Sequence, residues 1–168
     1  MFLIKFYCFS RYTWWEGKNS SCNTIDGTDG VQFGPPIYKD YKLDVYVHEL
    51  CRKLKLDYLQ DVQIKGINAY RFTPSADTFM NPFAPGGQQN MCFCTKKNSS
   101  ECNVTGLLDI STCSDVSLGA PIVMSSPHFY GVSDSVKSKF DGLKKINKDN
   151  ENDFRTLVDV EPVSESYF

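Results

Sequence analysis

The sequence predicts a mostly β fold of the α+β class, built from antiparallel strands. Three observations lead to this prediction. Several short runs alternate apolar and polar residues with a period of two, turn-forming residues bound each run, and only one short segment shows helical periodicity. The chain has 168 residues and is 41% hydrophobic, which suits one domain or a piece of a larger one.

Strands are expected wherever the alternation occurs. Leucine and valine alternate with polar residues over 43–48, and Leu54 and Leu56 begin a second run that Val62 and Ile64 continue. Further short strands are expected at 69–72, 121–125 and 156–160. Each of these three runs is followed by a proline, which lacks the amide hydrogen that a strand ladder needs.

A single short helix is expected after Ser133, which is a suitable N-cap residue. The apolar residues at 136, 140 and 143 recur at helical spacing. Gly142 is expected to stop or kink this helix early, because glycine costs more conformational entropy than other residues in a helix.

Composition excludes several classes of protein. The net charge of −2 argues against a protein that binds nucleic acid through a basic face. The longest apolar stretch, residues 1–9, is broken by Lys5 and is far shorter than the ~20 residues of a membrane-spanning helix. It also lacks the small-residue cleavage site of a signal peptide.

Seven cysteines indicate a disulfide-bonded protein of an oxidising compartment. Four of them, Cys92, Cys94, Cys102 and Cys113, are spaced by one, seven and ten residues, which does not fit the paired ligands of a structural zinc site. A bond from Cys94 to Cys102 closes a short loop, whereas one between Cys92 and Cys94 is strained. Six paired cysteines still allow fifteen connectivities.

Three Asn-x-Ser/Thr sequons predict N-glycosylation, at Asn19, Asn98 and Asn103. The last two flank Cys102 in a polar stretch typical of a surface loop. Glycans at these positions would agree with an extracellular or luminal location.

Catalytic motifs are missing from the sequence, so the protein is predicted not to be an enzyme, with no catalytic residues, cofactor or metal ion. His48 ends a predicted strand and His128 lies in a predicted turn, and both are interpreted as structural. No Gly-x-Ser-x-Gly elbow and no phosphate-binding loop occurs. A secreted hydrolase remains an alternative if His128 shares a pocket with an acid or a thiol.

Several segments, taken in order, resemble the class B scavenger receptor family, which includes the platelet fatty-acid translocase and the lysosomal integral membrane protein. Each segment is short, but their common order and the positions of the cysteines make the resemblance specific. The resemblance rests on Trp15-Glu16, Ile25-Asp26-Gly27-Thr28-Asp29-Gly30, Leu50-Cys51-Arg52, residues 66–72, Cys92-Phe93-Cys94-Thr95, residues 106–111, Gly119-Ala120-Pro121-Ile122, residues 126–130, Asp141-Gly142-Leu143 and Asp159-Val160-Glu161-Pro162.

The resemblance implies three disulfide bonds, Cys22–Cys92, Cys51–Cys113 and Cys94–Cys102, and leaves Cys8 as a free thiol. It covers residues 14–163 as part of an ectodomain. Residues 1–13 and 164–168 match nothing in the motifs and are expected to be artefactual ends of a fragment that lacks the family's two membrane segments.

The family's fold is an antiparallel, barrel-like ectodomain with short helices, long disulfide-tied loops and a tunnel for lipids. The resemblance therefore implies a membrane glycoprotein that binds and transfers fatty acids, sterols, phospholipids or lipoproteins at the plasma or lysosomal membrane. A sorting receptor that carries a lysosomal enzyme is the alternative within the family. Apolar residues proposed for the tunnel wall are Val45, Val47, Ile67, Phe72, Ile122 and Met124.

Overall fold

The computed structural model describes residues 14–15, 20–94, 102–113 and 120–163. These residues form two compact units. The sheet unit consists of residues 24–75 and 157–163, and the loop unit consists of the described residues in 14–23 and 76–156. The fold is mostly β with short helices, as predicted.

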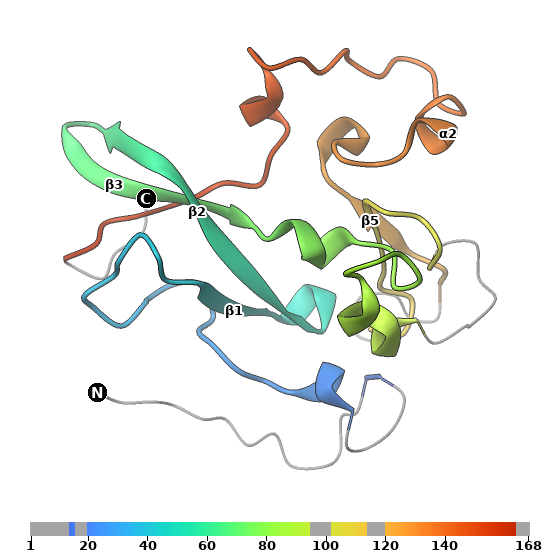
Figure 1. Cartoon of the computed structure of the whole chain (residues 1–168), viewed down its shortest axis with the longest axis horizontal. Coiled ribbons are helices and arrows are strands. Elements are labelled where there is room, and N and C mark those ends of the chain that lie inside the picture. The colour runs from blue at the N-terminus through green and yellow to red at the C-terminus, as the bar shows by residue number, and fades with distance from the viewer. Residues whose placement is uncertain (1–13, 16–19, 95–101, 114–119, 164–168) are drawn as a thin grey trace. The chain divides into compact units, whose positions relative to one another are not determined.

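A four-stranded antiparallel sheet forms the sheet unit (Figure 1). Its strands are β1 (Leu43–Val47), β2 (Arg52–Ile64), β3 (Ile67–Pro74) and β6 (Val158–Val160), in the order β1-β2-β3-β6. The short 3-10 helix η2 (His48–Leu50) joins β1 to β2. Strands β2 and β3 form a hairpin whose turn residues, Lys65 and Gly66, both have positive φ. Such a turn matches the twist of the two strands.

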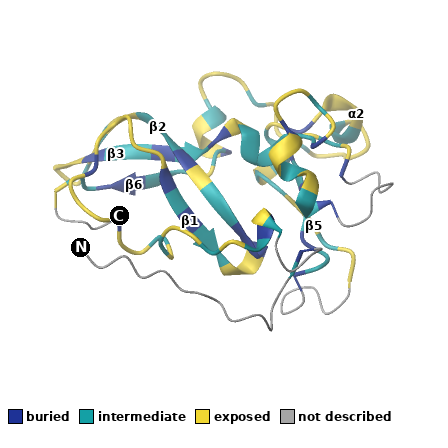
Figure 2. Ribbon diagram, turned by 60° about the horizontal axis from the view of Figure 1, so that its bottom comes forward, coloured by how far each residue is buried: buried dark blue, intermediate teal, exposed yellow. Residues whose placement is uncertain are grey.

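One face of this sheet carries the apolar core of the unit. Leu43 and Val45 of β1 lie opposite Leu56 and Leu54 of β2, while Phe72 of β3 lies opposite Val158 of β6. Figure 2 shows buried residues along the strands. The buried core residues are Phe33, Ile37, Leu43, Val45, Leu56, Phe72 and Val160.

A β-bulge interrupts the pairing of β2 with β3. Tyr58 lies opposite Phe72, but the next paired residue, Gln60, lies opposite Arg71. The extra residue, Leu59, reverses the alternation of β2 beyond it. The run predicted to begin at Leu54 and Leu56 and to continue to Val62 and Ile64 is therefore one strand, but its alternation is interrupted: even-numbered residues face the core before Leu59, and odd-numbered residues face it afterwards.

The loop unit is built mainly from short helical turns and a two-stranded sheet. Strands β4 (Leu107–Asp109) and β5 (Val123–Ser125) are antiparallel. The helical turns are η1 (Ser21–Asn23), η3 (Ala76–Phe79), η4 (Gln88–Phe93), η5 (Pro127–Phe129), α2 (Asp134–Lys137) and η6 (Glu151–Asp153).

Helix α2 begins directly after Ser133, where the sequence places the N-cap, but it ends at Lys137. It is shorter than the spacing of Val136, Phe140 and Leu143 suggests. Phe140 lies beyond the helix and stacks on Phe129, with 4.6 Å between ring centroids. This ring contact replaces the helical i, i+4 contact with Val136 that the periodicity suggests. Within the described ranges, no helix has the length and apolar character needed to cross a membrane.

Candidate functional site

The six residues proposed for a tunnel wall do not all lie on one surface. Val45 and Phe72 are in the core of the sheet unit, and Val47 packs against that core. Ile67 is 41% exposed and, by strand alternation, lies on the opposite face from Phe72. Ile122 and Met124 belong to the loop unit. The sheet unit thus places three of the six on one apolar face.

This apolar face ends in a polar cluster that the sequence motifs do not reveal. Because of the bulge, Asp61 lies opposite Tyr70 on the core side of the sheet. Lys39 donates a hydrogen bond to Asp61 at 2.6 Å, and the Tyr58 hydroxyl donates another at 2.9 Å. The Lys39 ammonium lies 5.7 Å from the Tyr58 ring centroid and 5.2 Å from that of Tyr70. The apolar face of the sheet is therefore bordered by the ammonium group of Lys39 and the carboxylate of Asp61.

Charge in this cluster is mutually stabilised. The hydrogen bond from Lys39, followed by that from Tyr58, lowers the pKa of Asp61 below its usual value. The same contact with Asp61 raises the pKa of Lys39. Partial desolvation and the hydrogen bond to Asp61 raise the pKa of Tyr58. At neutral pH the cluster therefore holds one ammonium, one carboxylate and one neutral phenol.

The opposite face of the sheet carries a bidentate ion pair. Arg71 of β3 and Asp159 of β6 are directly opposite each other. The guanidinium donates from Nε to Oδ1 at 2.6 Å and from Nη2 to Oδ2 at 2.7 Å. The hydrogen bonds to Asp159 raise the pKa of Arg71. This pair joins β6, which is three residues long, to residues almost ninety positions earlier in the chain.

The loop unit is cross-linked by disulfides next to a buried tryptophan. The structure contains the bonds Cys22–Cys92 and Cys94–Cys102, which are two of the three expected pairs. Cys51 and Cys113 are also disulfide-bonded. Trp15 is 1% exposed and contacts the Phe93 ring edge-to-face at 5.0 Å. Cys8 lies outside the described residues.

Trp15 is also held through its backbone. Its amide donates to Oδ1 of Asn23 and its carbonyl accepts from Nδ2 of the same side chain, both at 2.9 Å. Asn23 follows Cys22 directly, so one side chain connects the Trp-Glu segment with the disulfide. Trp15 and the Cys22–Cys92 disulfide are therefore held together in one packed structure.

The Asn103 sequon is exposed and lies on a loop with defined contacts. Asn81 donates from its backbone amide to Oγ1 of Thr105 at 3.1 Å and from its side chain to the Asn103 carbonyl at 2.7 Å. The disulfide at Cys102 holds the preceding residue. The Asn103 side chain takes part in neither contact with Asn81. Asn19 and Asn98 lie outside the described residues.

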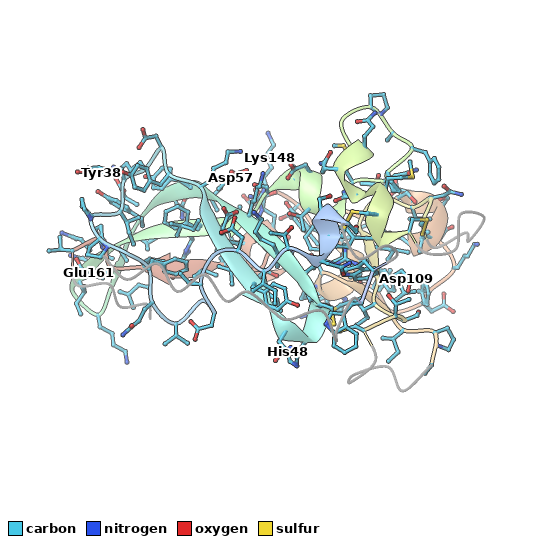
Figure 3. The ribbon with its side chains drawn as sticks, turned by 90° about the horizontal axis from the view of Figure 1, so that it is seen from below. Tyr38, His48, Asp57, Asp109, Lys148 and Glu161 are labelled. Carbon is cyan, nitrogen blue, oxygen red and sulfur yellow. A yellow bond between two sulfur atoms is a disulfide. The ribbon has the colours of Figure 1, made fainter. Side chains whose placement is uncertain are left out.

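His128 contacts a backbone amide and an aromatic ring. Nδ1 of His128 accepts a hydrogen bond from the backbone amide of Lys144 at 3.3 Å, and its ring packs against Phe154 at 5.3 Å. His48 lies at the start of η2 and is labelled in Figure 3. Among the described residues, no group of three or more His, Cys, Asp or Glu side chains is placed to hold a metal ion.

Comparisons with known proteins identify similar chains among membrane proteins. The model of the CD36 family matches residues 2–165, which includes most of the N-terminal stretch that the motifs leave unmatched. Lysosome membrane protein 2 of Homo sapiens is 32% identical over 163 residues, covering 93% of this chain and 31% of the relative. Sensory neuron membrane protein 2 of Drosophila melanogaster is 32% identical over 155 residues, covering 89% of this chain and 26% of the relative.

Scavenger receptor class B member 1 of Mus musculus is 28% identical over 155 residues, covering 92% of this chain and 27% of the relative. The chain thus spans less than a third of the length of these relatives. Their names describe membrane proteins and a receptor, in agreement with the prediction that the chain is not an enzyme.

Proposed function

The chain belongs to the CD36 family, and from this premise we propose that it is part of a membrane receptor whose ectodomain binds and transfers lipids or lipoproteins. The observation that carries the proposal is the apolar face of the sheet unit together with the polar cluster at its border. A lipid has a long apolar chain, which an apolar surface binds, and a polar head, which polar groups at the border of that surface bind.

Contacts on the core side of the sheet support this proposal. Val47, Tyr58, Tyr70 and Val158 are only partly buried and pack on the closed core. Tyr58 makes edge-to-face contacts with Tyr70 at 5.8 Å and Phe72 at 6.0 Å. Tyr58 and Tyr70 lie beside Lys39 and Asp61, whereas Val47 is opposite Arg52, further along β2 from this cluster. In the proposal, an acyl chain lies on these partly buried side chains and its polar head is near the cluster.

The proposal places this chain on the extracellular or luminal side of the plasma membrane or the lysosomal membrane. The disulfide bonds of the structure support an oxidising compartment. The lysosomal location is supported by the relatives named lysosome membrane protein 2 in Homo sapiens and Mus musculus. Transport of a lysosomal enzyme stays the alternative function within the family.

A photoactivatable fatty acid tests the proposal on the full chain, produced through a eukaryotic secretory pathway. We expect labelling to fall several-fold in Val47→Trp, because the indole ring would occupy the partly buried surface on the core side of the sheet. Ile67→Trp is the matched control, because it adds the same ring on the other face of the sheet. Equal labelling of both variants and the unmodified chain, with disulfides intact in all three, would overturn the proposal.

A further inference from the structure

The two tyrosine rings beside Lys39 form two walls of an aromatic cage. Tyr58 of β2 and Tyr70 of β3 meet edge-to-face, with 5.8 Å between ring centroids and 88° between ring planes. The Lys39 ammonium lies 5.7 Å from the Tyr58 centroid and 5.2 Å from the Tyr70 centroid. Both distances are within the ~6 Å at which the face of a ring attracts a cation. The two rings therefore act together on one positive charge.

A carboxylate adds an anion to this cage. Oδ2 of Asp61 accepts a hydrogen bond from the Lys39 ammonium at 2.6 Å, and Oδ1 accepts one from the Tyr58 hydroxyl at 2.9 Å. Tyr58 and Tyr70 pack on the closed core of the sheet unit, which holds their rings in place. Aromatic faces arranged around a cation are the means by which proteins bind quaternary ammonium groups. The cage has the components of such a site.

The cation in the cage belongs to the chain itself and lies on a well-anchored turn. Ile37 is buried, and its amide donates to the Pro162 carbonyl at 3.3 Å. The amide of Tyr41 donates to the carbonyl of Tyr38 at 3.0 Å, and their rings meet edge-to-face at 5.0 Å. Tyr38, labelled in Figure 3, directly precedes Lys39 in the chain. The backbone of Lys39 is therefore held beside the rings, while its long side chain is free to rotate.

The Lys39 side chain can leave the cage at little cost. The side chains of Lys39 and Asp61 are 49% and 60% exposed, and exposed ion pairs of this kind contribute little to stability. A lysine ammonium is strongly hydrated and has a flexible four-carbon stem, so water replaces the contacts that it loses. A quaternary ammonium group has methyl groups in place of N–H donors, and therefore gains less from water and more from the rings.

We propose that Tyr58, Tyr70 and Asp61 bind a quaternary ammonium group, and that Lys39 occupies this site when the ligand is absent. A choline lipid and a free quaternary ammonium cation share this chemistry. The inference rests on the proposed function and deepens it, because the cage lies at the border of the apolar face and would select the head group of the lipid. Lys39 acts as a built-in competitor that only a better cation for the rings displaces.

Saturation-transfer NMR on the methyl protons of two probes tests the cage in the full chain. Tetramethylammonium chloride represents the free cation, and dihexanoylphosphatidylcholine represents the lipid. Lys39→Met should tighten binding of both probes several-fold, because the competing ammonium is removed. Tyr70→Leu should weaken it roughly fivefold, the usual contribution of one cation–π contact, whereas Tyr70→Phe should retain it because the ring remains.

Lys42→Met is the matched control, because Lys42 is also exposed and pairs with a carboxylate, that of Asp57, at 3.1 Å. Its affinity for the probes should equal that of the unmodified chain. An equal gain in both lysine variants, or equal affinity in Tyr70→Leu and Tyr70→Phe, overturns the inference. Misfolding does not imitate the gain expected for Lys39→Met.

A competitor without methyl groups on its nitrogen tests the chemistry of the ligand. Dihexanoylphosphatidylethanolamine should displace the probes poorly, and displacement as strong as that by the choline lipid overturns the inference. Tighter binding of the choline lipid than of tetramethylammonium supports a lipid head group as the ligand, and equal binding supports a free cation. Fatty-acid labelling without binding of either probe removes only this inference. Probe binding that depends on Tyr70, without fatty-acid labelling, removes only the proposed function.

Discussion

At the scale of single residues, two of the ion pairs in the sheet unit, Arg71–Asp159 and Lys39–Asp61, differ in their access to water. The side chains of Arg71 and Asp159 are 22% and 11% exposed, whereas those of Lys39 and Asp61 are 49% and 60% exposed. Water competes for exposed charges and screens them, while a partly buried charge that loses its partner is left poorly solvated. The first pair should therefore matter more for stability.

We predict that Asp159→Asn lowers the free energy of unfolding by roughly 1.5–3 kcal/mol, the usual value for hydrogen bonds to a charged group. The loss arises because Arg71 keeps its charge without a counterion. Urea unfolding followed by circular dichroism measures it. Asp61→Asn is the control and should shift the midpoint less, and a larger shift in the control would contradict this ranking of the two pairs.

We also predict that Asn103 carries an N-linked glycan. Asn103→Gln should remove one glycan from the secreted chain, because its exposed side chain forms neither of the contacts with Asn81 and the loop keeps its hydrogen bonds. Mass spectrometry before and after glycosidase treatment measures the change. An unmodified peptide containing Asn103 in the unsubstituted chain would argue against luminal exposure of this loop.

At the scale of elements, Gly106 lies close to the backbone of two other segments of the loop unit, at Val132 and at Phe79. Gly106 has φ of +95°, and a Cβ there would lie 2.6 Å from Cα of Val132. The amide of Gly106 donates to the Phe79 carbonyl at 2.7 Å. This glycine therefore lets the start of the β4 segment approach the backbone that follows η5, which a side chain would prevent.

Gly106→Ala should destabilise the chain more than Gly142→Ala does. Gly142 also has positive φ, of +79°, but nothing lies within 4 Å of a Cβ built there. Alanine at 142 should cost about 1 kcal/mol for its left-handed backbone, and alanine at 106 should add the steric conflict to this cost. Thermal unfolding of the two variants gives the comparison. Equal melting temperatures would show that the Val132 contact relaxes freely.

The β-bulge in β2 is an element-level feature with a consequence for the candidate site. Uninterrupted alternation would place Val62 and Ile64 on the same face as Leu54 and Leu56. With Leu59 as an extra residue, Asp61 reaches the core side instead and meets Lys39. The alternation of apolar and polar residues does not reveal where β2 changes which of its residues face the core. Leu59, the extra residue, is itself apolar and fits a strand.

At the scale of the whole molecule, disulfide bonds link segments that are distant in sequence. The Cys22–Cys92 bond spans 70 residues and the Cys94–Cys102 bond spans eight. In the chain-entropy model, the longer loop contributes roughly 4 kcal/mol and the short one roughly 2.5 kcal/mol. The longer cross-link should therefore restrict the unfolded chain more.

Peptide mapping of the secreted chain without reduction should recover Cys22–Cys92 and Cys94–Cys102. It should also recover a third bridge between Cys51 and Cys113, with Cys8 available to an alkylating reagent. These pairs agree with the bonds in the structure and with the disulfide-bonded state of Cys51 and Cys113. A peptide linking Cys92 to Cys102 would contradict the framework.

Several features of this protein were determined by its sequence alone. Local alternation places β1, β3 and β6 close to their observed positions, because side chains in a strand alternate whatever lies beside the strand. The order of short motifs predicts the family, and the family model confirms it. Arg71 and Asp159 each lie in one of those motifs, but local patterns give no indication that they pair.

Tertiary structure alone decided the features that depend on contacts between distant residues. Phe140 stacks on Phe129 and lies outside α2, so its spacing from Val136 did not extend the helix. The bulge places Asp61 next to Lys39, and the pairing of β3 with β6 places Arg71 opposite Asp159. Each outcome is set by which surfaces meet in three dimensions, and the free energy of such contacts exceeds the weak preferences of short segments.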